Sequence, residues 1–91
     1  MSTGTVEVRL AALLHSYTRG ARVVHAPGAT LGEVFDALDE RYPGIRFRIV
    51  DEQDRMRRHV RVFVNGADAR DLATPLADGD KLYIVGALSG G

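Results

Sequence analysis

The sequence predicts one small α+β domain, in which a mixed sheet of four to five strands is covered by one main helix. Short runs of alternating apolar and polar residues occur near both ends of the chain, which is typical of half-buried strands. One amphipathic helix with a clear start and stop lies between these runs. The 91 residues, 45% of them hydrophobic and 26% charged, suit a single domain with a modest core.

Two strands are expected in the first 27 residues. Over residues 5–10 apolar and charged side chains alternate, as in a strand with one buried face. The alternating residues are Val6, Glu7, Val8, Arg9 and Leu10. A second β-rich run, residues 22–26, ends at the turn signal Pro27-Gly28, and the segment 11–19 between the runs has no regular pattern. Two strands joined in this way most simply form a hairpin.

The main helix follows directly. Thr30 and Glu33 form an S/T-x-x-E capping box, in which the hydroxyl and the carboxylate each satisfy an otherwise unpaired backbone N–H group. Pro43-Gly44 ends the helix. Apolar residues at helical spacing give it one face that we expect to cover the sheet, while charged residues lie largely on the other face. The apolar face comprises Leu31, Val34, Phe35, Leu38 and Tyr42.

The middle of the chain holds an ambiguous segment, a basic cluster and a third strand. Residues 45–50 fit either a short helical turn or a strand, and residues 51–54 form a polar loop. Alternation predicts a strand over residues 60–64, closed by the hairpin-type pair Asn65-Gly66. The arginine-rich stretch could face an acidic partner, although a solvated charged edge is the simpler explanation. Its members are Arg55, Arg57, Arg58, His59 and Arg61.

The last strand, residues 81–85, follows an Asp-Gly-Asp turn and leads directly into the end of the chain. We therefore predict a folded domain over residues 1–85 and a flexible tail over residues 86–91. The tail consists of Gly86, Ala87, Leu88, Ser89, Gly90 and Gly91. Because glycine has no Cβ, such a tail suits a narrow groove in a partner, which would receive the Gly91 α-carboxylate. Terminal glycines can also be a frayed end.

Composition excludes several functions. Acidic and basic residues balance at 12 each, which removes the broad electrostatic argument for a nucleic acid or membrane partner. No apolar run could span a bilayer and the first residues do not form a signal peptide, so we expect a cytoplasmic protein. Without cysteine there is no disulfide, thiolate nucleophile or iron–sulfur cluster. His15, His25 and His59 are scattered, and we interpret them as structural or surface residues rather than catalytic or metal-binding groups.

The expected order of elements, with the last strand returned to the middle of a mixed sheet, is that of a β-grasp, ubiquitin-like domain. Nearly the whole chain resembles the MoaD/ThiS family of sulfur-carrier proteins. The resemblance rests on Thr30-Leu31-Gly32-Glu33, Tyr42-Pro43-Gly44, Val62-Phe63-Val64-Asn65-Gly66, Leu76-Ala77-Asp78-Gly79-Asp80 and Gly90-Gly91. Within the family, the length and the polar loop are more similar to the CysO group, the carriers of actinobacterial cysteine synthesis, than to the thiamine carriers. Gly86-Ala87-Leu88 stands where many members have a proline pair.

This resemblance implies that the chain is not an enzyme and binds no cofactor or metal. An adenylyltransferase of the MoeB/ThiF type would use ATP and Mg²⁺ to adenylate Gly91, and a sulfur donor would then form a thiocarboxylate. A biosynthetic enzyme making cysteine, molybdopterin or a related metabolite would accept the sulfur. Two other functions remain open: a protein modifier joined through Gly91 to lysines of other proteins, and a binding module that docks without chemistry.

Strand parity predicts where a partner would dock. Side chains alternate along a strand, so Phe63, Tyr83 and Val85 should point away from the helix if their neighbours point toward it. In the β-grasp order the last strand lies beside the third, which would bring Phe63 and Tyr83 together on an open sheet face. Such a pair is either a docking patch for the activating enzyme or a cross-strand pair that only stabilises the sheet.

Overall fold

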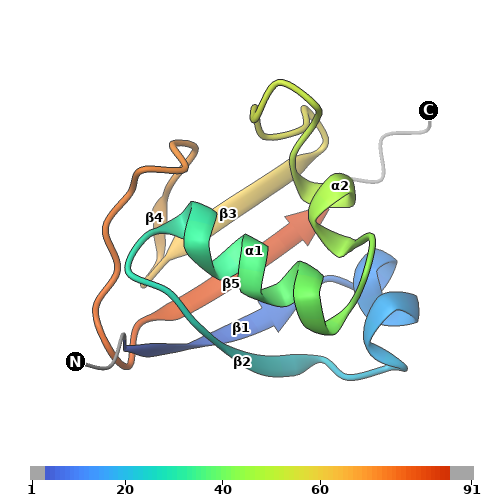
Figure 1. Cartoon of the computed structure of the whole chain (residues 1–91), viewed down its shortest axis with the longest axis horizontal. Helices are drawn as coiled ribbons and strands as arrows, with labels where there is room; N and C mark the ends of the chain where they lie inside the picture. Colours follow the sequence, from blue (N-terminus) through green and yellow to red (C-terminus); the bar gives the residue numbers. More distant parts are fainter. Residues whose placement is uncertain (1–3, 87–91) are drawn as a thin grey trace.

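The protein is represented by a computed structural model that describes residues 4–86. The predicted β-grasp fold is confirmed: helices cover one face of a five-stranded sheet (Figure 1). The elements in chain order are β1 (Thr5–Leu10), the 3-10 helix η1 (Ala12–Thr18), β2 (Val23–Pro27), α1 (Leu31–Arg41), α2 (Ile45–Ile49), β3 (Val60–Val64), β4 (Ala67–Asp68) and β5 (Lys81–Gly86). The strand order is β2-β1-β5-β3-β4, with β1 and β5 parallel and the other pairs antiparallel.

Helix α1 begins with the predicted capping box. The backbone N–H of Glu33 donates to the Thr30 hydroxyl at 3.2 Å. The Glu33 carboxylate accepts from the backbone N–H of Ala29 at 2.9 Å, one residue before the usual partner. The predicted apolar face is buried at Leu31, Val34, Phe35 and Leu38, whereas Tyr42 is the C-cap residue and only partly buried.

Two segments without a firm prediction form short helices. Residues 12–18 become η1, so the strands β1 and β2 pair antiparallel but are not joined by a tight turn. Residues 45–49 become α2. The carboxylate of Asp39 accepts from the backbone N–H groups of Gly44 and Arg46, at 3.0 and 3.1 Å, which satisfies donors at the start of α2. This contact with α1 favours the helical form of α2.

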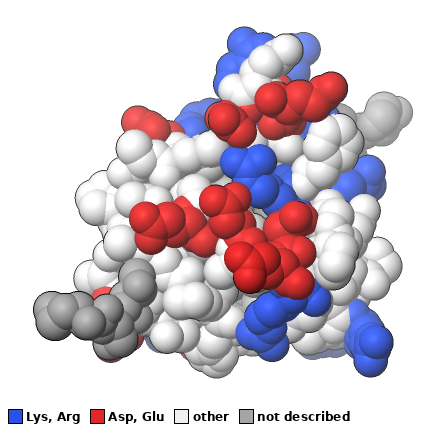
Figure 2. Space-filling model, viewed as in Figure 1, with Lys and Arg blue, Asp and Glu red and all other residues white. Residues whose placement is uncertain are grey.

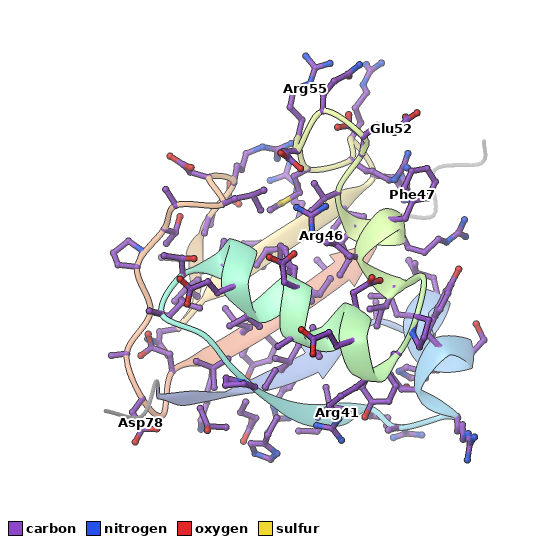
Figure 3. The ribbon with its side chains drawn as sticks, viewed as in Figure 1. Arg41, Arg46, Phe47, Glu52, Arg55 and Asp78 are labelled. Carbon is purple, nitrogen blue, oxygen red and sulfur yellow. The ribbon has the colours of Figure 1, made fainter. Side chains whose placement is uncertain are left out.

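Arg46 fastens α2 to the rest of the helical layer. Its guanidinium forms ion pairs with Asp36 of α1, at 2.9 Å, and with Asp54 of the following loop, at 3.1 Å. Figure 3 shows the Arg46 side chain between α1 and this loop. The polar loop 51–54 is therefore attached to the helices rather than free.

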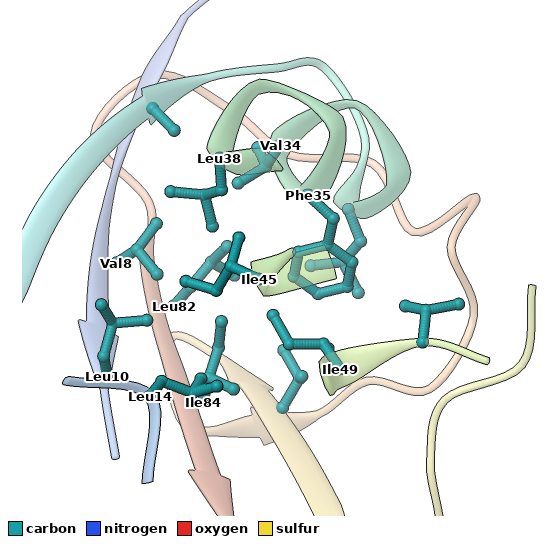
Figure 4. Close-up of a cluster of buried hydrophobic side chains, with 14 of the residues drawn as sticks. Val8, Leu10, Leu14, Val34, Phe35, Leu38, Ile45, Ile49, Leu82 and Ile84 are labelled. Atoms are coloured by element: carbon teal, nitrogen blue, oxygen red, sulfur yellow. The ribbon is translucent and has the colours of Figure 1, made fainter. Parts of the chain in front are cut away.

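A single core lies between the helices and the sheet (Figure 4). Its side chains come from one face of the strands and from α1, α2 and η1. The largest fully buried members include Phe35, Leu14, Leu38, Ile45, Ile49, Leu82 and Ile84. Because inward-pointing and outward-pointing residues alternate along β1, β3 and β5, the other residues of these strands face the open side of the sheet. Within residues 4–86 the structure contains no helix long and apolar enough to cross a membrane.

Candidate functional site

The open sheet face carries the predicted aromatic pair. Phe63 of β3 is directly opposite Tyr83 of β5 in the antiparallel register, which confirms their placement as neighbours. Tyr83 and Val85 are 38% and 41% exposed, and Phe63 is partly buried. These three side chains line an open hollow together with Asn65, Gly66 and Lys81. We call Phe63, Tyr83 and Val85 the open-face patch.

Arginine from β1 joins this patch, which the sequence did not predict. Arg9 is opposite Tyr83 in the parallel β1–β5 register, and its guanidinium lies 5.6 Å from the centre of the Tyr83 ring. Glu7 accepts a hydrogen bond from Arg9 at 2.8 Å. This bond holds the pKa of Glu7 below its ordinary value and raises the pKa of Arg9. The hydrogen bond to Glu7 thus holds the Arg9 guanidinium beside the Tyr83 ring. Strand parity places Arg9 on the open face, but only the β1–β5 register brings it to Tyr83.

A hydrogen-bonded turn closes one end of the hollow. Asn65 and Gly66 have positive φ angles of 50° and 90°, as a two-residue hairpin of the predicted type requires. The Asn65 side chain donates to the Asp80 carboxylate at 3.0 Å and accepts from the backbone N–H of Lys81 at 3.0 Å. The other Asp80 oxygen accepts from the backbone N–H of Ala77 at 2.8 Å. The Ala77 hydrogen bond and then the Asn65 bond hold the pKa of Asp80 below its ordinary value.

Gly86 requires a correction to the predicted boundary. The sequence predicts it as the first residue of a flexible tail, but it is the last residue of β5 and pairs with Val60 of β3. A Cβ atom on Gly86 would collide with the side chain of Leu13 from η1, whose Cγ would lie 3.2 Å away. Gly86 therefore belongs to the packed end of the sheet. The other predicted tail residues, Ala87, Leu88, Ser89, Gly90 and Gly91, lie outside the described part of the chain.

The histidines do not form a site in the described structure. One ring nitrogen of His15 lies 3.0 Å from the backbone carbonyl of Leu10, which is a structural contact. His25 and His59 are exposed on β2 and just before β3. Over residues 4–86 no group of three or more histidine or acidic side chains is arranged to hold a metal ion.

The described residues form a five-stranded sheet whose central strand, β5, ends beside the open-face patch. The model of the ThiS family matches residues 8–91. The chain belongs to the ThiS family. The resemblance to MoaD/ThiS proteins is thereby confirmed.

The relatives of this ThiS-family chain include sulfur carriers. Sulfur carrier protein CysO of Mycobacterium tuberculosis is 38% identical over 91 residues, covering 94% of this chain and 98% of the relative. A chain in the crystal structure of the Amycolatopsis orientalis BexX/CysO complex is 36% identical, with a TM-score of 0.87, and the match covers 94% of this chain and 99% of that one. The expected similarity to CysO is confirmed.

A relative with a different name has the same fold. SAMP1 of Haloferax volcanii is 32% identical, with a TM-score of 0.81, and the match covers 97% of this chain and 100% of that one. The abbreviation SAMP1 stands for small archaeal modifier protein 1. The fold is therefore shared by proteins named as carriers and as modifiers, and cannot by itself separate these two functions.

Proposed function

We propose that this chain is a sulfur carrier, whose Gly91 carboxylate is adenylated by a partner enzyme and converted to a thiocarboxylate that delivers sulfur for cysteine biosynthesis. The observation that carries the proposal is its 38% identity to the sulfur carrier CysO over nearly the full length of both chains. The geometry is consistent with it, because β5 runs through the middle of the sheet and ends at Gly86, five residues before Gly91.

The proposed chemistry begins with activation. A carboxylate with an ordinary pKa of roughly 3.5 is anionic at neutral pH and resists nucleophilic attack. Adenylation would join a carboxylate oxygen of Gly91 to the α-phosphorus of ATP and release pyrophosphate. A sulfide-level donor would then attack the carbonyl carbon, AMP would leave, and the thiocarboxylate would remain. ATP and Mg²⁺ would be used by a MoeB/ThiF-type adenylyltransferase, so this chain is the substrate and not the catalyst. We propose the cytoplasm as its location because this step consumes ATP.

We assign docking on the activating enzyme to the open-face patch. Exposed aromatic side chains are frequent energetic centres of protein interfaces. The patch lies on two paired strands, with Phe63 on β3 and both Tyr83 and Val85 on β5. The pairing of these strands continues to Val60 and Gly86. An enzyme seated on this patch would be close to the point from which residues 87–91 continue. The Amycolatopsis orientalis structure, a BexX/CysO complex, provides a precedent for a related carrier bound to another protein.

Mass spectrometry of the chain purified from its native host tests the proposal. We expect a fraction of the purified molecules to be heavier by the mass difference between sulfur and oxygen, because a thiocarboxylate has one sulfur atom in place of a carboxylate oxygen. Deleting Gly91, or replacing Gly90 with leucine, should abolish ATP–pyrophosphate exchange by the activating enzyme and leave the melting temperature unchanged. Exchange that continues with the chain lacking Gly91 would refute the role of this carboxylate.

A protein modifier is the second candidate, favoured by the similarity to SAMP1. The same mass measurement separates the two functions, since conjugation would join the chain to another protein through an amide bond. Lys81 is the only lysine in this chain, which limits chains of linked copies to one side-chain site. Conjugates without any thiocarboxylate would favour the modifier.

A further inference from the structure

The segment that joins β1 to β2 is longer than the pairing of these strands requires. Antiparallel neighbours can be joined by a two-residue turn. Here residues 11–22 separate the strands, and seven of them form η1 (Ala12–Thr18). Runs of 3-10 helix longer than about four residues are uncommon, because their hydrogen-bond geometry is poor. Connecting the two strands therefore does not by itself explain η1.

Several contacts hold η1 at the end of the sheet. Leu14 is fully buried in the core. The Thr18 hydroxyl donates to the Ala21 carbonyl at 2.8 Å, and one ring nitrogen of His15 lies 3.0 Å from the Leu10 carbonyl. Helix α2 packs against η1. Because these contacts involve the core, the following turn, β1 and α2, they fix the position of η1.

Leu13 of η1 packs on the last residue of β5. Its side chain occupies the space that a Cβ atom of Gly86 would fill, and it is only partly buried itself. In the sheet, Gly86 pairs with Val60 of β3. The backbone N–H of Ala11 donates to the Ile84 carbonyl at 2.8 Å, which joins the residue before η1 to β5. The end of β5 is therefore held between η1 and β3.

The contact between Leu13 and Gly86 does not belong to the open-face patch. Gly86 is covered by η1 on the helix side of the sheet, whereas the adjacent Val85 is exposed on the other side and lines the open hollow. On the helix-covered face, acidic side chains gather over α1 (Figure 2). An uncharged substitution of Leu13 leaves that charge pattern intact. It also removes no side chain from the docking patch.

We propose that Leu13 is a positioning residue for the activation of Gly91. By holding Gly86, it sets the point at which residues 87–91 leave the domain, and so the place that the Gly91 carboxylate can reach in the activating enzyme. Five residues span at most roughly 17 Å. The inference rests on the proposed function, in which this carboxylate is adenylated while the open-face patch holds the enzyme.

Loss of the Leu13 side chain would free Gly86 on its helix side. The strand end could then open, and the tail would leave the domain at an earlier residue. A longer connection lowers the effective concentration of the carboxylate at the enzyme's active site. A misplaced reacting group costs rate even where binding is intact. The rate of activation should therefore fall, while docking through the open-face patch stays the same.

The experiment separates positioning from docking and from stability. The probe is the host's adenylating enzyme, purified by following ATP–pyrophosphate exchange that depends on this chain. Its kcat is measured with each full-length variant, and calorimetry gives the affinity. Leu13→Ala removes the contact, Leu13→Val shortens the side chain by one carbon, and Leu13→Met keeps its volume. Val6→Ala is the stability control, because Val6 is fully buried in β1 at the end of the sheet opposite to Gly86.

We expect Leu13→Ala to lower the kcat of exchange about tenfold, with the affinity for the enzyme equal to that of the parent. Leu13→Met should keep the parental kcat, and Leu13→Val should lie between the two. Nitrogen-15 relaxation of the Val85 and Gly86 amides should show increased motion in Leu13→Ala but not in Val6→Ala. Circular dichroism melting identifies the variants that are folded.

A parental kcat in folded Leu13→Ala overturns the inference, as does an equal loss of kcat in Val6→Ala. If Leu13→Ala does not fold, a parental kcat in Leu13→Val overturns it in the same way. If the parent chain supports no exchange, the proposed function fails and the inference fails with it. Exchange that the parent supports and that no Leu13 variant alters refutes the inference alone.

Discussion

The side chain of Leu13 occupies the space in which Gly86 would carry a Cβ atom. Leu13 belongs to η1 and Gly86 ends β5, so this contact joins the first helical segment to the last strand. The contact forms because Gly86 lies on the inner side of the sheet, beneath η1. Glycine at this position therefore reflects close packing.

Gly86→Ala should destabilise the domain by about 1–3 kcal/mol, because the added methyl group overpacks the contact with Leu13. Introducing Leu13→Ala into this variant should recover part of that loss by making room for the methyl group. Chemical denaturation measures both effects in a double-mutant cycle. Gly32→Ala is the matched control: the new methyl group would meet Leu72 at 3.4–3.5 Å, ordinary contact, and α1 should gain helix propensity. Additive effects at residues 13 and 86 would contradict the packing argument.

Phe35→Ala should cost about 3–5 kcal/mol of unfolding free energy, since its ring is fully buried and truncation leaves a cavity. This is a large share of the stability of a small domain. Denaturant unfolding, followed by far-ultraviolet circular dichroism, measures the loss. Phe47→Ala serves as the control because that ring is half exposed. Equal losses in the two variants would show that burial in the core does not set the cost.

The combined change Phe63→Ala and Tyr83→Ala should weaken binding to the activating enzyme at least about tenfold, or about 1.4 kcal/mol. The reason is the loss of two aromatic side chains from the open-face patch. Calorimetric titration of the two purified proteins measures the affinity, with Val23→Ala as an exposed apolar control. A cross-strand pair that only stabilises the sheet would instead lower the melting temperature and leave the affinity of the folded protein intact.

Asp80→Asn should lower stability by about 1 kcal/mol at neutral pH, because an amide cannot accept both hydrogen bonds that the carboxylate accepts. The folded-state pKa of Asp80 is depressed. Its contribution is therefore present above the ordinary carboxyl pKa and is lost as the pH falls through the folded-state value.

Unfolding free energies measured from pH 7 down to pH 2 check this sign. The difference between parent and Asp80→Asn should shrink toward the acidic end. Asp68→Asn, which changes an exposed carboxylate on β4, should show no such convergence. A constant difference between the parent and Asp80→Asn at every pH would mean that the Asp80 charge is not involved.

Local signals made most of the fold predictable. The alternation over residues 5–10 and 60–64 corresponds to strands with the predicted bounds, and the Thr30–Glu33 capping box marks the start of α1. Residues 12–18 and 45–49 were not predictable, because their helical form depends on partners outside each segment. For α2 these partners are Asp39, which caps it, and the core that receives Ile45 and Ile49.

The candidate site was predictable in part. Parity along two strands was enough to place Phe63 opposite Tyr83, because the side-chain period in a strand is two. Arg9 was missed, since its contact with Tyr83 depends on the register between the first and last strands. The exposure of Phe47 was not predicted, because residues 45–50 fitted either a helical turn or a strand. A strand would place Phe47 on the same face as Ile45 and Ile49, whereas a helix places it on the opposite face.

The sequence by itself determined the β-grasp class, the family, the apolar face of α1 and the proposed chemical role of Gly91, because these depend on local periodicity and on the order of short motifs. Only the tertiary structure decided which side chains meet. It placed Leu13 on Gly86, Arg9 on Tyr83 and Arg57 on Phe47. Each of these contacts joins segments whose distance in space is set by packing of the whole core, and no local pattern encodes that distance.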